Sequence, residues 1–170
     1  PDGGVWIRSY HTLRQLSRAF DVTALCFERT GSARHDVHAA VEKLSEIAPT
    51  EVFPVPQEKS GVRKLADHCG SLATGRPFTV YKHRSRGFRK RLAEMLETED
   101  FDLVHVDSLD LSTHLPLLEE LPVACVHHNV ESQLLRRRAG AEDNVLARWY
   151  LLLQSRWQRR EEKRWCARVD

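Results

Sequence analysis

The sequence predicts a single α/β domain built on a doubly wound, mostly parallel sheet with helices on both faces. Short apolar runs alternate with longer segments of helical periodicity, which is typical of β-α-β units. Several runs are rich in β-branched residues and bounded by proline or polar residues, as buried parallel strands are. The length of 170 residues suffices for one domain with a substantial core. We therefore assign residues 1–170 to one domain.

The first half of the chain alternates between predicted helices and predicted strands. Helical periodicity covers residues 5–20, 36–47 and 60–75, and strand patterns cover residues 22–27 and 51–55. Pro54 and Pro56 cannot donate to a β-ladder, which places the second strand near a sheet edge. Gly75, just before Pro77, marks the end of the third helix.

The second half begins with the densest basic run of the chain, residues 82–91, which continues into apolar residues and so forms the first part of a helix. A strand at 101–106, a helix at 109–118 and a strand at 122–126 follow. We expect the strand at 122–126 to be buried on both faces.

Residues 131–167 form a long helical segment in which Gly140 is a candidate break. Asn129 and Ser132 are candidate caps for its start. An apolar row at three–four spacing follows, comprising Leu146, Trp149, Tyr150, Leu153 and Trp157. The charged residues at 159–164 indicate a solvated face at its end.

The composition argues against a nucleic-acid binder, a membrane-spanning protein and a zinc protein. The formal net charge of +2 is too small to indicate a nucleic-acid binder. No run approaches the roughly 18 apolar residues of a membrane span, and no signal peptide is visible. The four cysteines form no CxxC pair, so a zinc site is not indicated, and we interpret them as reduced thiols of a cytoplasmic protein.

The two ends of the sequence have the character of interrupted elements. Pro1-Asp2-Gly3-Gly4 is a turn sequence that opens a helix, and such a turn normally follows a strand. Residues 167–170 resemble the beginning of another strand. We interpret the sequence as an excerpt of a longer protein from which the first strand is missing.

Two histidines directly follow the strand at 122–126. Ligands bind open α/β sheets at the carboxyl ends of the strands. Adjacent strand residues point to opposite faces, so only one of His127 and His128 is expected to reach a cleft, and His128 is the better candidate. A neutral imidazole there can accept a proton or donate to a developing charge. The alternative is a histidine whose hydrogen bonds are satisfied by backbone carbonyls.

Other polar residues are expected at the same sheet edge, each with a structural alternative. Gly3 and Gly4 at a helix N-terminus form either an anion site or a plain tight turn. Asp107 and Ser108 are candidate partners for sugar hydroxyls, or helix caps. Glu131 is able to hold a hydroxyl or a metal, or to complement the helix dipole.

The basic run forms a candidate membrane-binding patch beside Phe88. Its charge suits anionic lipid head groups. Nucleic acid is ranked lower, because aromatic platforms and a recognised nucleic-acid motif are missing, and a plain solvent-exposed face is the third possibility. The residues expected to contact lipid are Arg84, Arg86, Arg89, Lys90 and Arg91.

Three stretches together resemble the N-terminal domain of a bacterial family 4 glycosyltransferase, from the retaining group with the GT-B fold. Pro1-Asp2-Gly3-Gly4 followed by Ile7-Arg8 resembles the glycine-rich loop after the first strand of that family. Residues 101–107 resemble its "FD-V-H" strand, and residues 127–132 with the long helix after them are similar to its elbow. Asn129 departs from the family pattern, in which many relatives carry aspartate.

The resemblance implies a Rossmann-like acceptor-binding domain, with the nucleotide-sugar domain outside this sequence. It implies a retaining hexosyltransferase that moves a sugar from a nucleotide sugar to a glycan or lipid-linked acceptor in polysaccharide biosynthesis, with no metal or other cofactor. Gly3 and Gly4 would face donor phosphates or the acceptor, and His128 would be the catalytic residue beside the transferred sugar. The remaining predicted substrate-binding residues are Arg8, Asp107, Ser108, Asn129 and Glu131.

The same resemblance implies a cytoplasmic enzyme that sits peripherally on the inner membrane through the basic run, without a nucleic-acid partner. Two alternatives remain open. One is a GT-B epimerase that acts on a nucleotide sugar. The other is a non-catalytic Rossmann-like binding module recruited to membranes.

Overall fold

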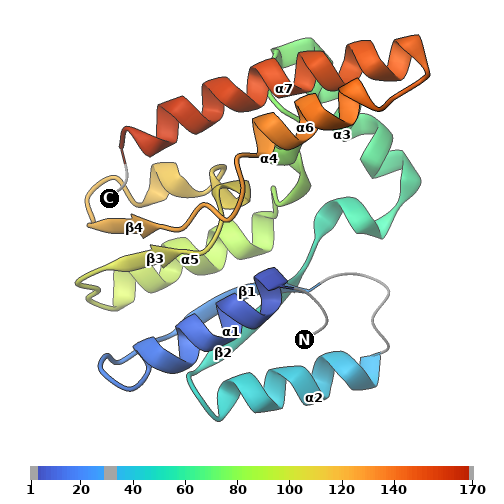
Figure 1. Cartoon of the computed structure of the whole chain (residues 1–170). Coiled ribbons are helices and arrows are strands. Elements are labelled where there is room, and N and C mark those ends of the chain that lie inside the picture. Colours follow the sequence, from blue (N-terminus) through green and yellow to red (C-terminus); the bar gives the residue numbers. More distant parts are fainter. Residues whose placement is uncertain (1–3, 29–33, 169–170) are drawn as a thin grey trace.

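Figure 1 shows the computed structural model, which describes residues 4–28 and 34–168. These residues form helices and short strands. The helices are α1 (Gly4–Leu16), α2 (Arg34–Ser45), α3 (Gly61–Thr74), α4 (Thr79–Lys82), α5 (Arg86–Thr98), α6 (Glu131–Gly140) and α7 (Val145–Cys166). The strands are β1 (Ala24–Glu28), β2 (Thr50–Pro54), β3 (Val104–Val106) and β4 (Val123–Cys125).

The strands form two parallel pairs. β1 pairs with β2 and β3 pairs with β4, with Ala24 opposite Thr50 and Val104 opposite Val123. Within the described residues each pair is a separate two-stranded sheet. The predicted α/β class with parallel strands is therefore confirmed, whereas the predicted continuous doubly wound sheet is not found in this part of the chain. β1 and β2 are half-buried along their whole length.

The main apolar core lies beside β3 and β4. It comprises Val106, Leu109, Leu115, Leu118, Val123 and Trp165. The expected two-sided burial of the strand at 122–126 is wrong beyond Val123, because Ala124 and Cys125 are half-buried.

A second, aromatic cluster joins the other sheet to α5. Phe27 of β1 stacks on Phe88 with ring centroids 4.5 Å apart, and Phe88 lies 4.6 Å from the His114 ring.

Two predicted helices differ from the structure for local reasons. Residues 109–118 form two 3₁₀ turns, η2 (Leu109–Leu111) and η3 (Leu115–Leu117), rather than one helix. Pro116 has no N–H to continue a helical ladder. The basic run does not begin a helix at residue 82, because α5 starts at Arg86, after Ser85 accepts a hydrogen bond from the Phe88 N–H.

The long C-terminal segment divides where Gly140 predicted a break. α6 ends at Gly140, and Asn144 caps α7 by accepting hydrogen bonds from the backbone N–H groups of Leu146 and Ala147. The predicted capping of α6 by Asn129 or Ser132 is wrong. Val130 occupies the cap position without a side-chain hydrogen bond.

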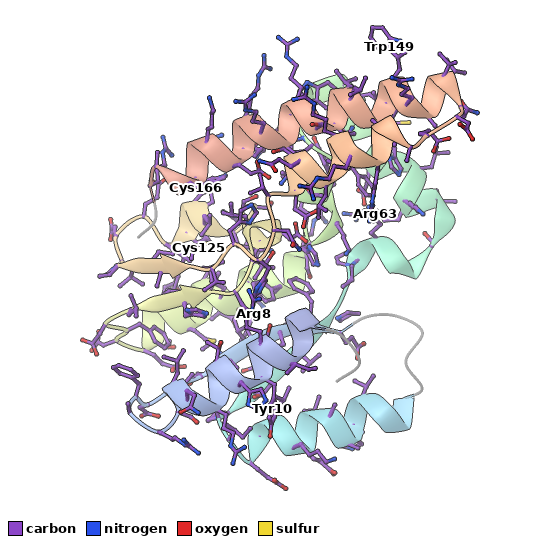
Figure 2. The ribbon with its side chains drawn as sticks, in the orientation of Figure 1. Arg8, Tyr10, Arg63, Cys125, Trp149 and Cys166 are labelled. Carbon is purple, nitrogen blue, oxygen red and sulfur yellow. The ribbon has the colours of Figure 1, made fainter. Side chains whose placement is uncertain are left out.

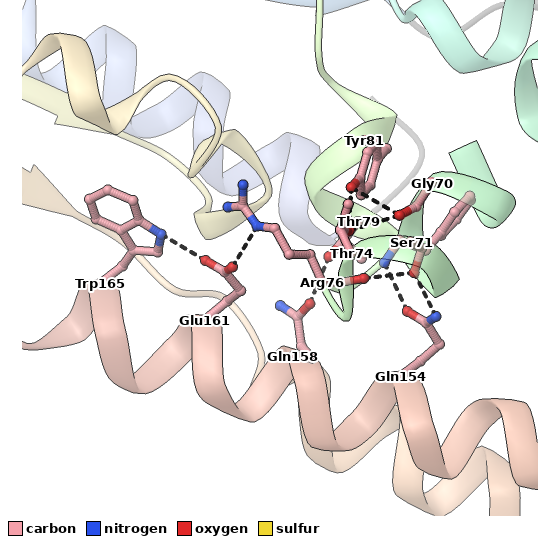
Figure 3. Close-up of polar contacts among 11 residues, drawn as sticks. Gly70, Ser71, Thr74, Arg76, Thr79, Tyr81, Gln154, Gln158, Glu161 and Trp165 are labelled. Atoms are coloured by element: carbon pink, nitrogen blue, oxygen red, sulfur yellow. Dashed lines mark hydrogen bonds and ion pairs between the residues drawn. The ribbon is translucent and has the colours of Figure 1, made fainter. Parts of the chain in front are cut away.

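The inward face of α7 is held by buried polar side chains (Figure 3). Gln154 accepts a hydrogen bond from the Phe78 N–H at 2.8 Å and donates to Ser71 Oγ at 2.8 Å. Thr79 donates to Gln158 at 2.6 Å. Buried amides bonded in this way fix the rotation of a helix, because turning it would leave polar groups without partners. The predicted apolar row is therefore wrong in part, since Leu146 and Trp149 point into solvent.

Among the described residues, no helix is both long and apolar enough to cross a membrane. The four cysteines are free thiols. Cys26 and Cys125 are half-buried on strands, whereas Cys69 and Cys166 are exposed. Burial raises the pKa of the Cys26 thiol, and burial together with Cys166 and Asp107 raises that of Cys125 to about 11.

Candidate functional site

The carboxyl ends of β3 and β4 meet the beginning of α1 (Figure 1). Asp107 directly follows β3, and His128 lies three residues beyond the end of β4. Figure 2 shows Arg8 reaching from α1 toward these strands. Three chain segments that are distant in sequence therefore place a cation, an imidazole and a carboxylate together at one edge.

His128 lies between Arg8 and Asp107, and its side chain is 7% exposed. Its Nδ1 is 3.2 Å from Arg8 Nη1, and its Nε2 is 3.4 Å from Asp107 Oδ1. A guanidinium group only donates hydrogen bonds, so Nδ1 is the acceptor. The proton of the neutral ring is then on Nε2, facing the carboxylate. Arg8 and Asp107 together fix both the tautomer and the direction of the ring.

Asp107 is anionic at neutral pH. One oxygen, Oδ2, accepts a hydrogen bond from Ser9 of α1, and the other, Oδ1, lies 3.7 Å from His105 Nε2. Burial favours the protonated carboxyl, but the contacts with His105, Ser9 and His128 outweigh it and hold the pKa of Asp107 below its usual value. At 3.4 and 3.7 Å the two imidazole contacts are longer than ordinary hydrogen bonds, and each becomes an ion pair only when its ring is protonated.

His127 belongs to a different environment. Its Nε2 lies 3.6 Å from Oε1 of Glu162, which is on α7. The Glu162 carboxylate accepts hydrogen bonds from Ser132 N at 2.9 Å and Ser132 Oγ at 2.6 Å. Glu162 thus satisfies the first turn of α6 in place of the predicted cap. The two adjacent histidines face different elements, and His128 is the one that contacts Arg8 and Asp107.

The other predicted substrate-binding residues differ in their exposure and in their hydrogen-bond partners. Gly3 falls outside the described residues, and Gly4 is the first residue of α1. Ser108 caps η2 by accepting from the Asp110 N–H, which was its structural alternative. Asn129 is exposed. Burial and the nearby Asp110 raise the pKa of Glu131, although His127, a hydrogen bond with Asn129 and Arg138 oppose the rise.

The predicted membrane-binding residues surround the start of α5. Arg84, Arg86, Arg89 and Lys90 are exposed, while Arg91 is half-buried and pairs with Glu51 at 2.7 Å. Phe88 is 5% exposed and packs on Phe27, so it is not available to contact lipid. The apolar part of the predicted patch is therefore directed into the core.

Sequence reasoning missed His105 and Ser9. His105 lies two positions before the predicted Asp107 at the end of one strand, and the strand period of two would have placed the two residues on one face. Ser9 gave no such signal, because its contact with Asp107 depends on how α1 packs.

The cluster offers a positive charge to an anionic ligand. The exposed Arg8 has a bidentate geometry for phosphate or carboxylate. Nδ1 of His128 contacts Arg8 in this structure, so it becomes open to a ligand only when the guanidinium turns away. Within the described residues, no group of three His, Cys, Asp or Glu side chains is arranged to hold a metal ion.

A separate surface hollow lies near the amino end of β4. It is lined by Leu115, Leu118, Glu119, Leu121, Val123, Trp165 and Arg168. Val123 begins the strand whose far end leads to His128, so the hollow is distinct from the candidate site.

Comparison of this chain with models of known protein families, with curated proteins and with solved structures found no match.

Proposed function

We propose that this chain is the acceptor-side domain of a retaining glycosyltransferase that uses a nucleotide sugar. The observation that supports this most directly is the row Arg8–His128–Asp107 at the carboxyl ends of two parallel strands. That edge is where α/β proteins bind ligands. The resemblance described above supplies the reaction class, and the full enzyme would have the Rossmann-like GT-B architecture with a second, nucleotide-sugar domain.

Each member of the row has a role in this proposal. Arg8 meets the charge of the donor phosphates, which leaves Nδ1 of His128 free to bind a sugar hydroxyl. His128 then stabilises charge at the transferred sugar, and Asp107 is a positioning residue that keeps the ring proton on Nε2. The bond from the sugar to the phosphate breaks, a glycosidic bond to an acceptor hydroxyl forms, and the acceptor proton leaves with the nucleoside diphosphate.

The test is turnover in the full-length protein with UDP- and GDP-activated hexoses, followed as nucleoside diphosphate release. We expect His128→Ala to lower turnover roughly tenfold to a thousandfold, because a transition-state contact is lost. Arg8→Ala should raise the donor KM more than it lowers kcat, and Arg8→Lys should restore part of the affinity. The matched control is His11→Ala, an exposed histidine on the same helix as Arg8.

The other outcomes identify other functions. Near-native turnover of His128→Ala would remove His128 from the chemistry. An inverted sugar nucleotide formed without any acceptor would favour an epimerase. Donor binding that depends on Arg8 without any turnover would favour a binding module.

A further inference from the structure

The outward face of α7 begins with a row of exposed apolar side chains. Leu146 is 80% exposed and Trp149 is 71% exposed, and Val145 and Leu152 are exposed beside them. Figure 2 shows Trp149 pointing away from the body of the molecule. Four apolar residues within two turns of one helix are more than the scattered single residues that an ordinary surface carries.

The same face continues as a row of cations. Val145, Trp149, Leu152, Arg156, Arg160 and Lys163 follow one another at three–four spacing and therefore share one side of the helix. All are exposed, as are the neighbouring Arg159 and Arg164. The helix has 22 residues and is about 33 Å long, so the apolar half and the cationic half each extend over two turns or more.

The acidic residues of α7 do not offset this charge. Glu161 points inward to Arg76 and to the Trp165 ring N–H, each at 3.0 Å (Figure 3). Glu162 is buried against Ser132. Asp143 and Glu142 precede the helix, beside its apolar end, and Glu142 accepts a hydrogen bond from the Asn144 N–H. The outward face of the second half of α7 is therefore cationic only.

Exposure of the apolar row is a fixed property of the fold. Gln154 and Gln158 are buried on the inward face and bonded to Ser71 and Thr79. Rotating α7 to bury Trp149 would expose these amides and break their hydrogen bonds. The apolar side chains consequently remain on the surface of the isolated chain.

We propose that this outward face of α7 binds the surface of an anionic phospholipid bilayer, with Leu146 and Trp149 inserted among the head groups and the arginines against the lipid phosphates. Exposed tryptophan and leucine side chains suit the bilayer interface, and the arginines beside them suit the phosphates of anionic lipids. The start of α5 lacks the first of these features, because Phe88 is buried. This surface goes beyond the proposed function and does not depend on it.

The test is flotation of the protein with vesicles of phosphatidylcholine, with or without phosphatidylglycerol. We expect binding to vesicles that contain phosphatidylglycerol and at least tenfold weaker binding to phosphatidylcholine alone. The double variants Leu146→Ser/Trp149→Ser and Arg156→Glu/Arg160→Glu should each weaken binding to the anionic vesicles at least tenfold. The matched control is Arg86→Glu/Arg89→Glu on α5, which makes the same charge change and should bind as the unaltered protein does.

Because all of these side chains are exposed, the far-UV circular dichroism of the variants should equal that of the unaltered protein. Three results would overturn the proposal. The first is an unaltered protein that does not float with anionic vesicles. The second is an α7 variant that is folded and floats normally. The third is loss of binding in the α5 control alone. Self-association that depends on Trp149, without flotation, would show that a second copy covers this face instead.

Discussion

Replacing Glu162 should destabilise the protein more than any other single change of charge on α7. Its carboxylate is buried and accepts two hydrogen bonds from Ser132, one from the backbone N–H at 2.9 Å and one from the hydroxyl at 2.6 Å. Because the first turn of α6 has no side-chain cap of its own, Glu162→Ala leaves a buried donor without a partner there. The hydroxyl loses its partner as well.

The magnitude follows from these two bonds. A buried donor left unsatisfied costs about 1–3 kcal/mol, so two of them give a loss of about 2–6 kcal/mol in the free energy of unfolding. For a chain of this length, a loss of 3 kcal/mol corresponds to a fall in Tm of about 6–12 °C. Glu162→Gln keeps an acceptor oxygen of similar shape, and we expect it to cost about 1 kcal/mol.

The assay is urea unfolding of Glu162→Ala, Ser132→Ala and the double variant. We expect a coupling energy of about 1–2 kcal/mol between the two positions, because either substitution removes the bond from the Ser132 hydroxyl, whereas the bond from the Ser132 backbone N–H is lost only with Glu162. Glu161→Ala is the comparison on the same helix. It leaves one donor of a buried residue, the Trp165 ring N–H, and the partly exposed Arg76 without their partner, so we expect about half the cost of Glu162→Ala. Equal losses for Glu161→Ala and Glu162→Ala, or additive effects in the cycle, would refute this account of the α6 start.

Three further predictions concern other parts of the fold. Burial lowers the pKa of His114, despite its bond to the His83 carbonyl, so the unfolded chain binds the proton more tightly. Stability should therefore fall as the pH drops below about 6.5, and calorimetry of His114→Gln should show a shallower dependence of Tm on pH. Gly75 has φ 64°, so Gly75→Ala should cost about 1–2 kcal/mol in urea unfolding, and Gly75→Asn less. The exposed thiols of Cys69 and Cys166 should react with a disulfide reagent at neutral pH well before Cys125, because its pKa of about 11 keeps that thiol protonated.

The elements that could be predicted are those with a local chemical signal. Gly75 ends α3 as predicted, because a left-handed glycine acts within a few residues, and the Ser60 hydroxyl caps the start of this helix near the predicted boundary. The break after Gly140 followed the same logic. Residues 109–118 do not form the expected single helix, because Pro116 lacks an N–H for the helical ladder and the Ser108 hydroxyl caps only a short 3₁₀ turn.

The candidate site could be predicted only as far as strand ends define it. Asp107 and His128 follow strands, and that position alone indicated a shared edge. The hydrogen bond of Ser9 and the placement of Arg8 depend on the packing of α1 across the sheet edge, which no local pattern encodes. Likewise, the three–four row that includes Trp149 predicted an apolar side of α7 but did not show that polar amides, rather than Leu146 and Trp149, face the body of the molecule.

The separation of the strands into two sheets has a mechanical consequence for the site. In the part of the chain that the structure describes, no backbone ladder joins β1 to β3, and side chains make the connection instead. Arg8 is on α1, which directly precedes β1 in the chain, whereas its partner His128 follows β4. A phosphate bound to Arg8 as proposed would draw the guanidinium away from the imidazole and break this side-chain contact between the two sheets. Ligand binding at the site and the spacing of the two sheets would then change together.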